Sequence, residues 1–465
     1  MDAPKGGERP NILMIMTDQQ RWDSLSVTGA QGYETPNLDR LAAEGVLFDT
    51  CYCDNPICTP SRASLFTGKA LPGHGVYRLH DLLPEDQTPF PYLLREAGYS
   101  TALFGKWHLS GRIEEETRRH PRDGFDIYEW CMEAAVSLDS PLNGYGRWLK
   151  NKAPDFYARL QTKGRDIGVM PQEYSFTRWA AERTMSFLDS QGRNESPWFC
   201  LMSVFDPHNP YDDAPPGFRE RVGSPAVPIA DPGLLDTNIP GIRAELEHSY
   251  LGASANLTDQ DVEDMRRGYA ASLVLLDDEV GRVLSVLEES GQADQTLVIF
   301  TSDHGDMLGD HGLYVKGAFF YEPSVRVPLI LRWPGFLDPG KRIDAPVQLR
   351  DLAMTVMNAA GGADSLTDEE DVDSRDLAAV AQGRQASRER VTCLYRNTGI
   401  NDRGEYWDPP IHATMIRRGD WKLNWYHRRQ GDSASLPSIQ LFNLADDPNE
   451  LCNLADDAAA AGIRR

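Results

Sequence analysis

The chain has 465 residues, of which 41% are hydrophobic and 9% aromatic, and its formal net charge is -23. This length and composition predict a folded protein with a large buried core and exclude disorder of the whole chain. The acidic charge disfavours nucleic acids and anionic membranes as partners, so an anionic substrate would need local basic residues.

The first ten residues, MDAPKGGERP, contain no apolar run. The apolar stretch that follows them is too short for a signal peptide or a membrane span. Seven cysteines are spread thinly along the chain, an odd number that is not typical of a disulfide framework. We therefore expect a cytoplasmic protein with reduced thiols and no membrane segment.

Short apolar runs alternate with longer amphipathic stretches, which is typical of an α/β protein with a mostly parallel sheet covered by helices. The expected strands are 11–16, 100–105, 198–205, 296–302 and 327–333. Apolar residues at helical spacing predict helices over 172–190 and 258–290, each leading directly into a strand.

Two polar segments interrupt this pattern. Residues 209–257 are rich in Pro, Gly and Asp, which predicts an irregular surface excursion that could act as a lid. Residues 361–388 are polar and acidic and predict a linker. We therefore expect a main α/β domain over 1–360 and a C-terminal subdomain over 389–465, where short strand-like stretches indicate an antiparallel sheet.

Polar residues follow several expected strands, at the edge where open α/β sheets bind ligands. Asp18 and Gln19 follow the first strand, and Asp303 and His304 follow the fourth. Taken alone, such a pair also fits a turn that favours Asp. Together the four residues suit a divalent cation such as Ca²⁺, Mg²⁺ or Mn²⁺. The imidazole favours Mn²⁺, because Ca²⁺ prefers shells made of oxygen alone.

The stretch CTPSR at 58–62 places a thiol just before an expected helix start. Pro60 restrains the chain, Ser61 can cap the helix, and Arg62 lies in the first turn near the positive end of the helix. This arrangement predicts a small anion-binding cradle. A thiolate nucleophile would need a nearby His or a lowered pKa, and no residue close to Cys58 in sequence guarantees either.

CTPSRASLFTG at 58–68 resembles the first sulfatase signature, Cys-x-Pro-Ser-Arg followed by a Gly. GYSTALFGKWH at 98–108 is similar to the second signature, although Phe104 replaces a smaller residue. The resemblance extends to the first strand, to SDHGDMLGDHGLYVKG and to the C-terminal LFNLADDPNELCNLA. It implies an alkaline-phosphatase-like α/β/α sandwich with a small C-terminal antiparallel sheet, and hydrolysis of a sulfate monoester to an alcohol and inorganic sulfate.

The same resemblance implies that a formylglycine-generating enzyme converts Cys58 to formylglycine after translation. The implied metal ligands are Asp18, Gln19, the modified Cys58, Asp303 and His304. Gln and His make this set less negative than the four-oxygen version of the site. We expect one Ca²⁺ ion, the usual ion of the family, with Mn²⁺ as the alternative.

The resemblance also implies the first half of the reaction. A hydrated aldehyde has two hydroxyls on one carbon, and one of them would attack sulfur while Asp303 accepts its proton. Positive charge around the sulfuryl oxygens would come from the metal, Arg62, Lys106 and Lys316.

His208 would protonate the leaving alcohol as it departs in this first half. In the second half, His108 would deprotonate the remaining hydroxyl, which expels sulfate and restores the aldehyde. The chain departs from the choline sulfatases and phosphonate monoester hydrolases, which carry an Asn where this chain has Leu79. A polar contact is then missing, or Arg78 or His80 replaces it.

Two alternatives remain at this stage. A phosphonate monoester hydrolase or phosphodiesterase shares the modified cysteine and both ligand pairs, but generally lacks the Gly-Lys-x-His pattern that this chain keeps at Lys106 and His108. A catalytically silent metal-binding homologue would leave Cys58 as a thiol. The sequence leaves open whether the alcohol is aryl, choline, alkyl or sugar, and whether the protein forms oligomers.

Overall fold

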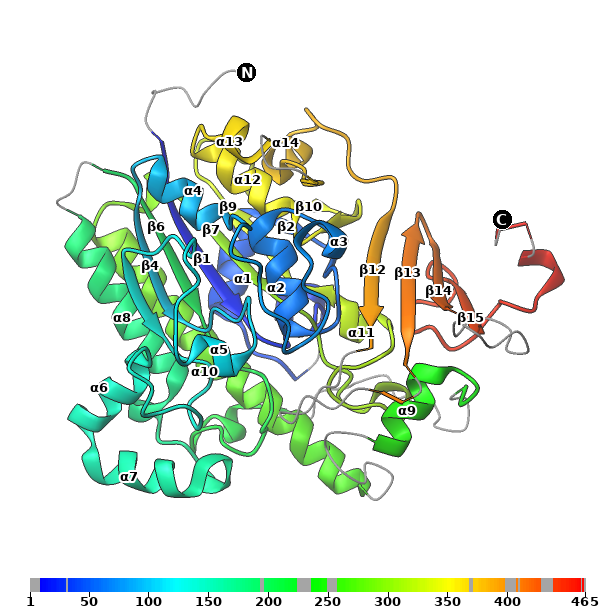
Figure 1. The fold of residues 1–465 in the computed structure, drawn as a ribbon, viewed down its shortest axis with the longest axis horizontal. Helices are drawn as coiled ribbons and strands as arrows, with labels where there is room; N and C mark the ends of the chain where they lie inside the picture. Colours follow the sequence, from blue (N-terminus) through cyan, green and yellow to red (C-terminus); the bar gives the residue numbers. More distant parts are fainter. Residues whose placement is uncertain are drawn as a thin grey trace.

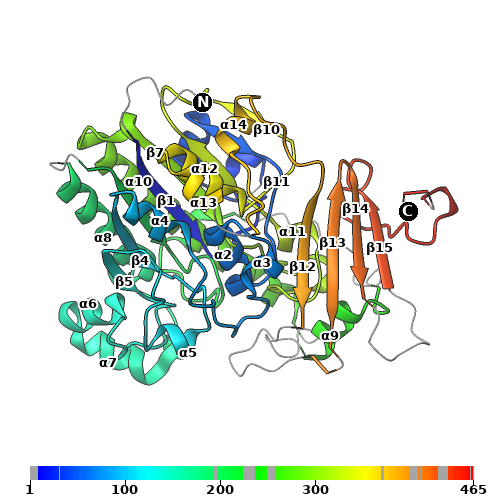
Figure 2. The same ribbon diagram turned by 45° about the horizontal axis from the view of Figure 1, so that its top comes forward.

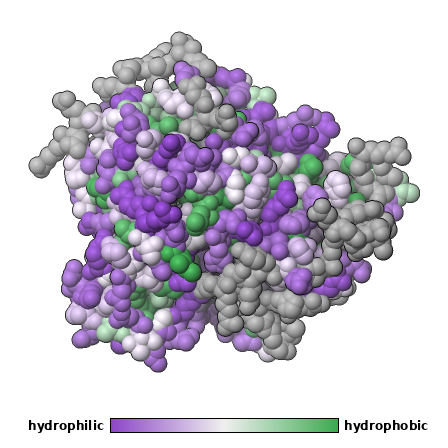
Figure 3. Space-filling model, viewed as in Figure 1, coloured by the Kyte–Doolittle hydropathy of each residue, from purple (hydrophilic) through white to green (hydrophobic). Residues whose placement is uncertain are grey.

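The computed structural model describes residues 9–30, 32–192, 196–223, 236–248, 257–367, 371–397, 407–408, 410–427, 438–460 and 462–463. A large α/β body forms most of the molecule, and a small separate sheet lies beside it (Figure 1). No helix in these ranges is long and apolar enough to cross a membrane. The face seen in Figure 3 is mainly hydrophilic, with hydrophobic residues in scattered patches, as the net charge of -23 predicts.

Within the described ranges, the central sheet has eight strands in the order β10-β2-β9-β7-β1-β6-β4-β5. Its four middle strands, which pair in parallel, are β7 (Thr296–Ser302), β1 (Asn11–Thr17), β6 (Trp198–Ser203) and β4 (Ser100–Gly105). The outer strands are β2 (Val46–Phe48), β5 (Ile127–Trp130), β9 (Leu329–Arg332) and β10 (Lys341–Ile343). All residues of β6 and β7 are buried, which explains why these strands read as continuous apolar runs.

The helices form two groups with the sheet between them (Figure 1). In the first group, α10 (Asp259–Glu289) packs against both α1 (Pro36–Ala43) and α8 (Phe176–Gln191). The second group consists of α2 (Cys58–Thr67), α4 (Phe90–Glu96) and α12 (Asp351–Ala359). Further helices are α3 (Leu71–His74), α5 (Arg112–Glu115), α6 (Gly144–Lys152), α7 (Pro154–Lys163) and α11 (Glu322–Val325).

The predicted strands over 11–16, 100–105, 198–205 and 296–302 are confirmed as β1, β4, β6 and β7. The strand predicted over 327–333 is confirmed over 329–332, but the prediction of one continuous strand across Pro328 is wrong. Pro328 has no N–H to donate, and the chain changes sheets there. Before it, β8 (Arg326–Val327) joins β3 (Cys51–Tyr52) and β11 (Val347–Gln348) in a three-stranded sheet, and after it β9 enters the central sheet.

The C-terminal sheet is antiparallel, as the sequence predicts, and its strands stand side by side in Figure 2. The strands are β12 (Val391–Arg396), β13 (His412–Arg418), β14 (Trp421–Tyr426) and β15 (Ser438–Asn443). Lys422 is fully buried and pairs with Glu322 at 2.9 Å and Glu450 at 2.8 Å. Because Glu322 belongs to α11, this ion pair fastens the small sheet to the α/β body.

The two polar segments are partly helical. Segment 209–257 contains α9 (Pro240–His248), and 224–235 and 249–256 lie outside the described residues, so its role as a lid stays a prediction. Segment 361–388 contains α13 (Ala363–Thr367) and α14 (Leu377–Ala381), which both contact α12. The described part of this segment is therefore packed on the body, because Leu366 and Leu377 are buried. The domain boundary there stays a prediction.

Candidate active site

Cys58 lies where the carboxyl ends of β1 and β7 meet the start of α2. The last residues of β1 and β7 are paired in register, so Asp18 and Asp303 leave neighbouring strands side by side. The Sγ atom of Cys58 lies 3.1 Å from His304 Nε2 and 3.7 Å from Asp18 Oδ1. Four buried residues form a cluster in which one ligand atom from each lies within 4.8 Å of all the others, namely Asp18, Cys58, Asp303 and His304. The structure thus brings together four of the five residues predicted as metal ligands.

This donor set fits a divalent cation. The Nδ1 atom of His304 donates to the carbonyl of Gly305 at 2.9 Å, which leaves Nε2 directed at the cluster. Burial raises the pKa of Asp18, but Lys106 and other nearby cations outweigh burial and hold it well below its usual range. Burial lowers the pKa of His304, but Asp303 and Cys58 together outweigh it and raise the pKa. Two carboxylates and an imidazole therefore surround a position that favours positive charge.

Gln19, the fifth predicted ligand, is also buried in the site. Its backbone N–H donates to Asp303 Oδ1 at 3.1 Å. Its side-chain Oε1 accepts from Lys316 Nζ at 2.7 Å, and its Nε2 donates to Asp306 Oδ2 at 2.6 Å. Because the amide oxygen is directed at Lys316, the role of Gln19 as a metal ligand stays a prediction.

Helix α2 begins at Cys58, three residues before the predicted cap at Ser61. The prediction of Ser61 as the cap is wrong, because its hydroxyl donates to the carbonyl of Asp303 at 2.6 Å. Cys58 therefore lies in the first turn, beside the positive end of the helix. Burial and a neighbouring carboxylate raise the pKa of its thiol, but Lys106, Lys316 and a nearby imidazole outweigh both and lower it. The site thus stabilises a negative charge at this position.

Arg62 supports the carboxylates and does not line the cavity around Cys58. The Nε atom of this fully buried residue donates to Asp303 Oδ2 at 2.7 Å, and Nη2 donates to Asp18 Oδ2 at 3.4 Å. Burial lowers the pKa of Arg62, but the two carboxylates outweigh it and raise the pKa. The sequence predicts Arg62 in an anion cradle, whereas in the structure its charge is used to hold the two Asp side chains.

His208 and Lys316 form a pair on the cavity wall. Lys316 Nζ lies 2.8 Å from His208 Nε2, and His208 Nδ1 lies 2.7 Å from the carbonyl of Asn209. The Nδ1 atom therefore carries the ring proton, and Nε2 accepts from the ammonium group. Burial lowers the pKa of His208 and Lys316 lowers it further. Burial also lowers the pKa of Lys316, but Cys58 and Asp18 outweigh it and raise the pKa, so the shared proton is on the lysine.

His108 is arranged as a neutral base. Its Nε2 lies 3.0 Å from the hydroxyl of Thr59, which itself donates to the carbonyl of Leu79 at 2.8 Å, so Nε2 carries the proton. The Nδ1 atom is buried and has no hydrogen-bond partner in the part of the chain that the structure describes. Burial lowers the pKa of His108, and Lys106 and Arg62 lower it further. A lone pair on Nδ1 is therefore available at neutral pH.

The family described as Sulfatase matches residues 10–363, and the family described as N-sulphoglucosamine sulphohydrolase, C-terminal, matches residues 309–465. The chain belongs to the sulfatase family. It is 30% identical to the multifunctional alkaline phosphatase superfamily protein PehA of Trinickia caryophylli, over 98% of this chain and 93% of that protein. It is 27% identical to an N-acetylglucosamine-6-O-sulfatase of Bacteroides thetaiotaomicron, over 98% of this chain and 84% of that protein.

Among solved structures, a phosphonate monoester hydrolase of Agrobacterium radiobacter is 25% identical, with a TM-score of 0.81 over 98% of this chain and 93% of that chain. The predicted fold, an alkaline-phosphatase-like α/β sandwich with a small antiparallel sheet, is confirmed. The predicted activity class is also confirmed, because the family and its named sulfatases act on sulfate esters.

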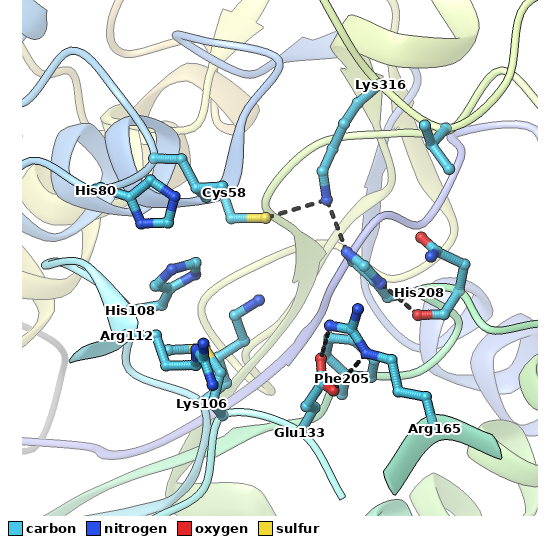
Figure 4. A pocket seen from close by; sticks show the side chains of 14 residues that line it. Cys58, His80, Lys106, His108, Arg112, Glu133, Arg165, Phe205, His208 and Lys316 are labelled. Carbon is cyan, nitrogen blue, oxygen red and sulfur yellow. Dashed lines mark hydrogen bonds and ion pairs between the residues drawn. The ribbon is translucent and has the colours of Figure 1, made fainter. Parts of the chain in front are cut away.

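In this sulfatase, a small cavity of about 70 Å³ opens onto Cys58 (Figure 4). Four other predicted catalytic residues line it, namely Lys106, His108, His208 and Lys316. Of the two residues predicted to replace the missing Asn, His80 lines this cavity, whereas Arg78 pairs with Asp81 at 2.9 Å and is not part of the lining.

The sequence did not single out Glu115, whose buried carboxylate holds the loop that carries His108. Its Oε1 accepts from the backbone N–H of Leu109 at 2.8 Å and of Ser110 at 3.1 Å. Its Oε2 accepts from the backbone N–H of His108 at 2.8 Å and from Trp130 Nε1 at 3.0 Å. Three consecutive glutamates occur here, and no local pattern distinguishes this one from its half-buried neighbours.

Proposed function

We propose that this enzyme hydrolyses a sulfate monoester to an alcohol and inorganic sulfate, with a formylglycine made from Cys58 as the nucleophile. The observation that supports this proposal most directly is the position of Cys58. Its sulfur lies at a helix start, 3.2 Å from Lys316 Nζ, between a buried ligand cluster and a cavity lined by two lysines and three histidines. In the mature enzyme, an oxygen of the hydrated aldehyde would replace the sulfur.

The proposed cofactor is one divalent cation, Ca²⁺ in the first place and Mn²⁺ as the alternative, held by Asp18, Gln19, residue 58, Asp303 and His304. When bound, the cation would supply Lewis-acid chemistry that lowers the pKa of the attacking hydroxyl. Arg62 would keep both carboxylates in place for it, because Arg62 contacts both of them.

In the first step, one hydroxyl of residue 58 would lose its proton to Asp303 and attack sulfur. A bond forms between this oxygen and sulfur while the bond from sulfur to the alcohol oxygen breaks. Lys106 and Lys316 would offset the charge on the sulfuryl oxygens, since both line the cavity.

The leaving alcohol takes a proton from the pair of Lys316 and His208 in this proposal. The lysine holds the proton before substrate binds, and His208 Nε2 is its hydrogen-bond acceptor. His208 can act as the direct donor once this proton has moved to it.

In the second step, Nδ1 of His108 would remove the proton from the second hydroxyl of residue 58. The bond from carbon to the sulfate oxygen then breaks, inorganic sulfate leaves, and the aldehyde returns. Water adds to the aldehyde and restores the hydrate. The buried Nδ1 atom supports this role, because it is the lone pair of a neutral imidazole and accepts no hydrogen bond from a described residue.

Two measurements test the proposal. Mass spectrometry of the peptide that contains residue 58, from protein made in its native host, should show an aldehyde in place of the thiol. An unmodified thiol in the active enzyme, or full activity of the Cys58→Ala variant, would refute the mechanism. An inactive protein with an intact thiol would instead identify the silent homologue.

The runner-up function is hydrolysis of phosphonate monoesters or phosphate diesters. The TM-score of 0.81 with a phosphonate monoester hydrolase and the 30% identity with a multifunctional protein favour it. The two functions are separated by kcat/KM for an aryl sulfate, a phosphate diester and a phosphonate monoester that share one leaving group, with Ca²⁺ and with Mn²⁺. A preference for sulfate supports the main proposal, and a preference for phosphonate or diester replaces it with the runner-up.

The proposed partners are a small sulfate ester and, during maturation, a formylglycine-generating enzyme. The cytoplasmic location stays a prediction.

A further inference from the structure

The charged residues on the cavity wall across from Cys58 are unequally paired. Arg112, Glu133 and Arg165 line it in addition to the proposed catalytic groups. In Figure 4, Arg112 and the pair of Glu133 and Arg165 lie across the cavity from Cys58. Arg165 grips Glu133 with two parallel hydrogen bonds, Nε to Oε1 and Nη2 to Oε2, each 2.7 Å long. Such a fork uses both carboxylate oxygens, so the pair is nearly neutral.

Arg112 has no such partner. Its guanidinium group makes no ion pair and no side-chain hydrogen bond with any residue that the structure describes. Glu133 is the one carboxylate among the described residues of the lining, and Arg165 already occupies it. Among the residues that the structure describes, the charge of Arg112 therefore has no opposite charge of its own on the cavity wall.

The backbone that carries Arg112 is fixed relative to the reactive groups. Arg112 begins the single turn α5, and Glu115, which holds the His108 loop, ends it. The preceding Gly111 donates its N–H to the carbonyl of Asp81 at 3.0 Å. A Cβ atom at Gly111 would lie only 3.1 Å from the backbone of His80, so the two segments are closely packed. The guanidinium is therefore presented from a rigid support.

We propose that Arg112 binds a second anionic group on the alcohol part of the substrate, so that the preferred substrate is a sulfate ester whose alcohol carries a carboxylate or another sulfate. This inference rests on the proposed function. A guanidinium fork matches the two oxygens of a carboxylate or sulfate. The positive charge that such a group needs is available at Arg112. The pair of Glu133 and Arg165 is nearly neutral and offers no net charge to the substrate.

The test compares 3-carboxyphenyl sulfate with 3-carbamoylphenyl sulfate, which have similar shapes but differ in charge. Wild type, Arg112→Met and Arg112→Lys are assayed with both esters. The matched control is Arg118→Met, because Arg118 lies three residues beyond α5, is exposed, and pairs with Glu85 at 3.0 Å outside the cavity.

We expect Arg112→Met to lower kcat/KM for the carboxylated ester about 10-fold to 100-fold, the range for a lost charge-assisted contact. The same variant should keep kcat/KM for the carbamoyl ester within about twofold of wild type, and this retained activity also shows that the variant is folded. Arg112→Lys should retain part of the preference for the carboxylated ester, and Arg118→Met should retain all of it. Added salt should weaken this preference in wild type. Equal losses with both esters, or no loss with either, would overturn the inference.

Binding of 3-hydroxybenzoate and 3-hydroxybenzamide, measured by calorimetry, tests Arg112 without turnover. We expect Arg112→Met to weaken binding of the benzoate alone. If no sulfate ester is cleaved but this difference is present, the proposed function fails and the anion subsite stands. If sulfate esters are cleaved and the difference is missing from both kinetics and binding, the subsite fails and the proposed function stands.

Discussion

The Glu115→Gln variant should slow turnover although it removes none of the groups proposed to react. Glu115 accepts four hydrogen bonds with two oxygens. Glutamine has nearly the same shape but only one oxygen, so in either orientation its amide N–H₂ group meets two donors that need an acceptor. Either the backbone N–H of His108 or that of its neighbour Leu109 is then left unsatisfied.

The magnitude follows from these contacts. Two buried donors without acceptors cost about 1–2 kcal/mol each, so the variant should be less stable by about 2–4 kcal/mol. His108 has a φ of 57°, in the left-handed region, which costs a non-glycine residue about 1–2 kcal/mol. Without its anchor, the loop should relax toward ordinary backbone angles and move Nδ1 out of position. General base catalysis is worth about 10²–10⁴-fold, so we expect kcat to fall about 10-fold to 100-fold.

The assay separates this role from a general loss of stability. His108 is proposed to act in the release of sulfate, so the variant should show a burst of alcohol followed by slow turnover. Mass spectrometry of the quenched enzyme should find the sulfuryl group on residue 58. The matched control is Glu114→Gln, whose side chain pairs with the exposed Arg118. Normal kcat in Glu115→Gln, or a fall in kcat without a burst, would refute the reasoning.

Three further predictions use the same site. Burial raises the pKa of Glu115 from 4.5 to about 7, so between these pH values the folded protein holds a proton that the unfolded chain releases. The contribution of Glu115 to the free energy of unfolding is therefore fully present below about pH 4.5. About 3 kcal/mol of it is lost as the pH rises through 7. Chemical denaturation of wild type and Glu115→Gln at several pH values should show a slope that is steeper in wild type by this amount, because other buried carboxyls titrate in both proteins, and parallel curves would contradict it. Lys316→Met should slow the hydrolysis of esters with poor leaving groups far more than that of esters with good ones, because proton donation to the alcohol matters most for poor leaving groups. A uniform loss of rate across a series of aryl sulfates would argue against the pair of Lys316 and His208 as the proton donor. Chelation of the metal should abolish activity. It should also lower the free energy of unfolding by about 2.7 kcal/mol relative to enzyme with the cation at 100 times its dissociation constant, and Ca²⁺ or Mn²⁺ should restore both properties. Unchanged activity after complete removal of metal, verified by elemental analysis, would exclude the cation.

Much of the fold could be predicted because its central strands are buried on both faces. The strands predicted over 100–105 and 296–302 match β4 and β7 residue for residue. Continuous apolar runs of this kind can be recognised without knowledge of their partners. The failure at 327–333 has a local cause, because the pattern records hydrophobicity but not the sheet that each half of the run joins on either side of Pro328.

The candidate site divides in the same way. Asp18 and Asp303 were predictable because each follows a recognisable strand, and parallel neighbours place their ends together. The ion pairs of Arg62 with Asp18 and Asp303 could not be predicted, because a position in the first helical turn does not indicate which carboxylates the side chain will reach. Glu115 and Arg112 were missed because their roles arise from contacts between segments, and neither stands at the end of a strand.

These two missed residues lie on the same helical turn, which would link the proposed binding of the alcohol to the position of the proposed base. Glu115 holds the backbone N–H of His108, and Arg112 begins the turn that Glu115 ends. A turn of four residues cannot shift at one end without moving the other, because the backbone N–H of Glu115 bonds to the carbonyl of Gly111 across it. An anionic group bound by Arg112 would therefore hold α5, and through it the loop of His108. Because His108 is proposed to act after the bond to the alcohol has broken, this support affects kcat only while the alcohol product stays bound.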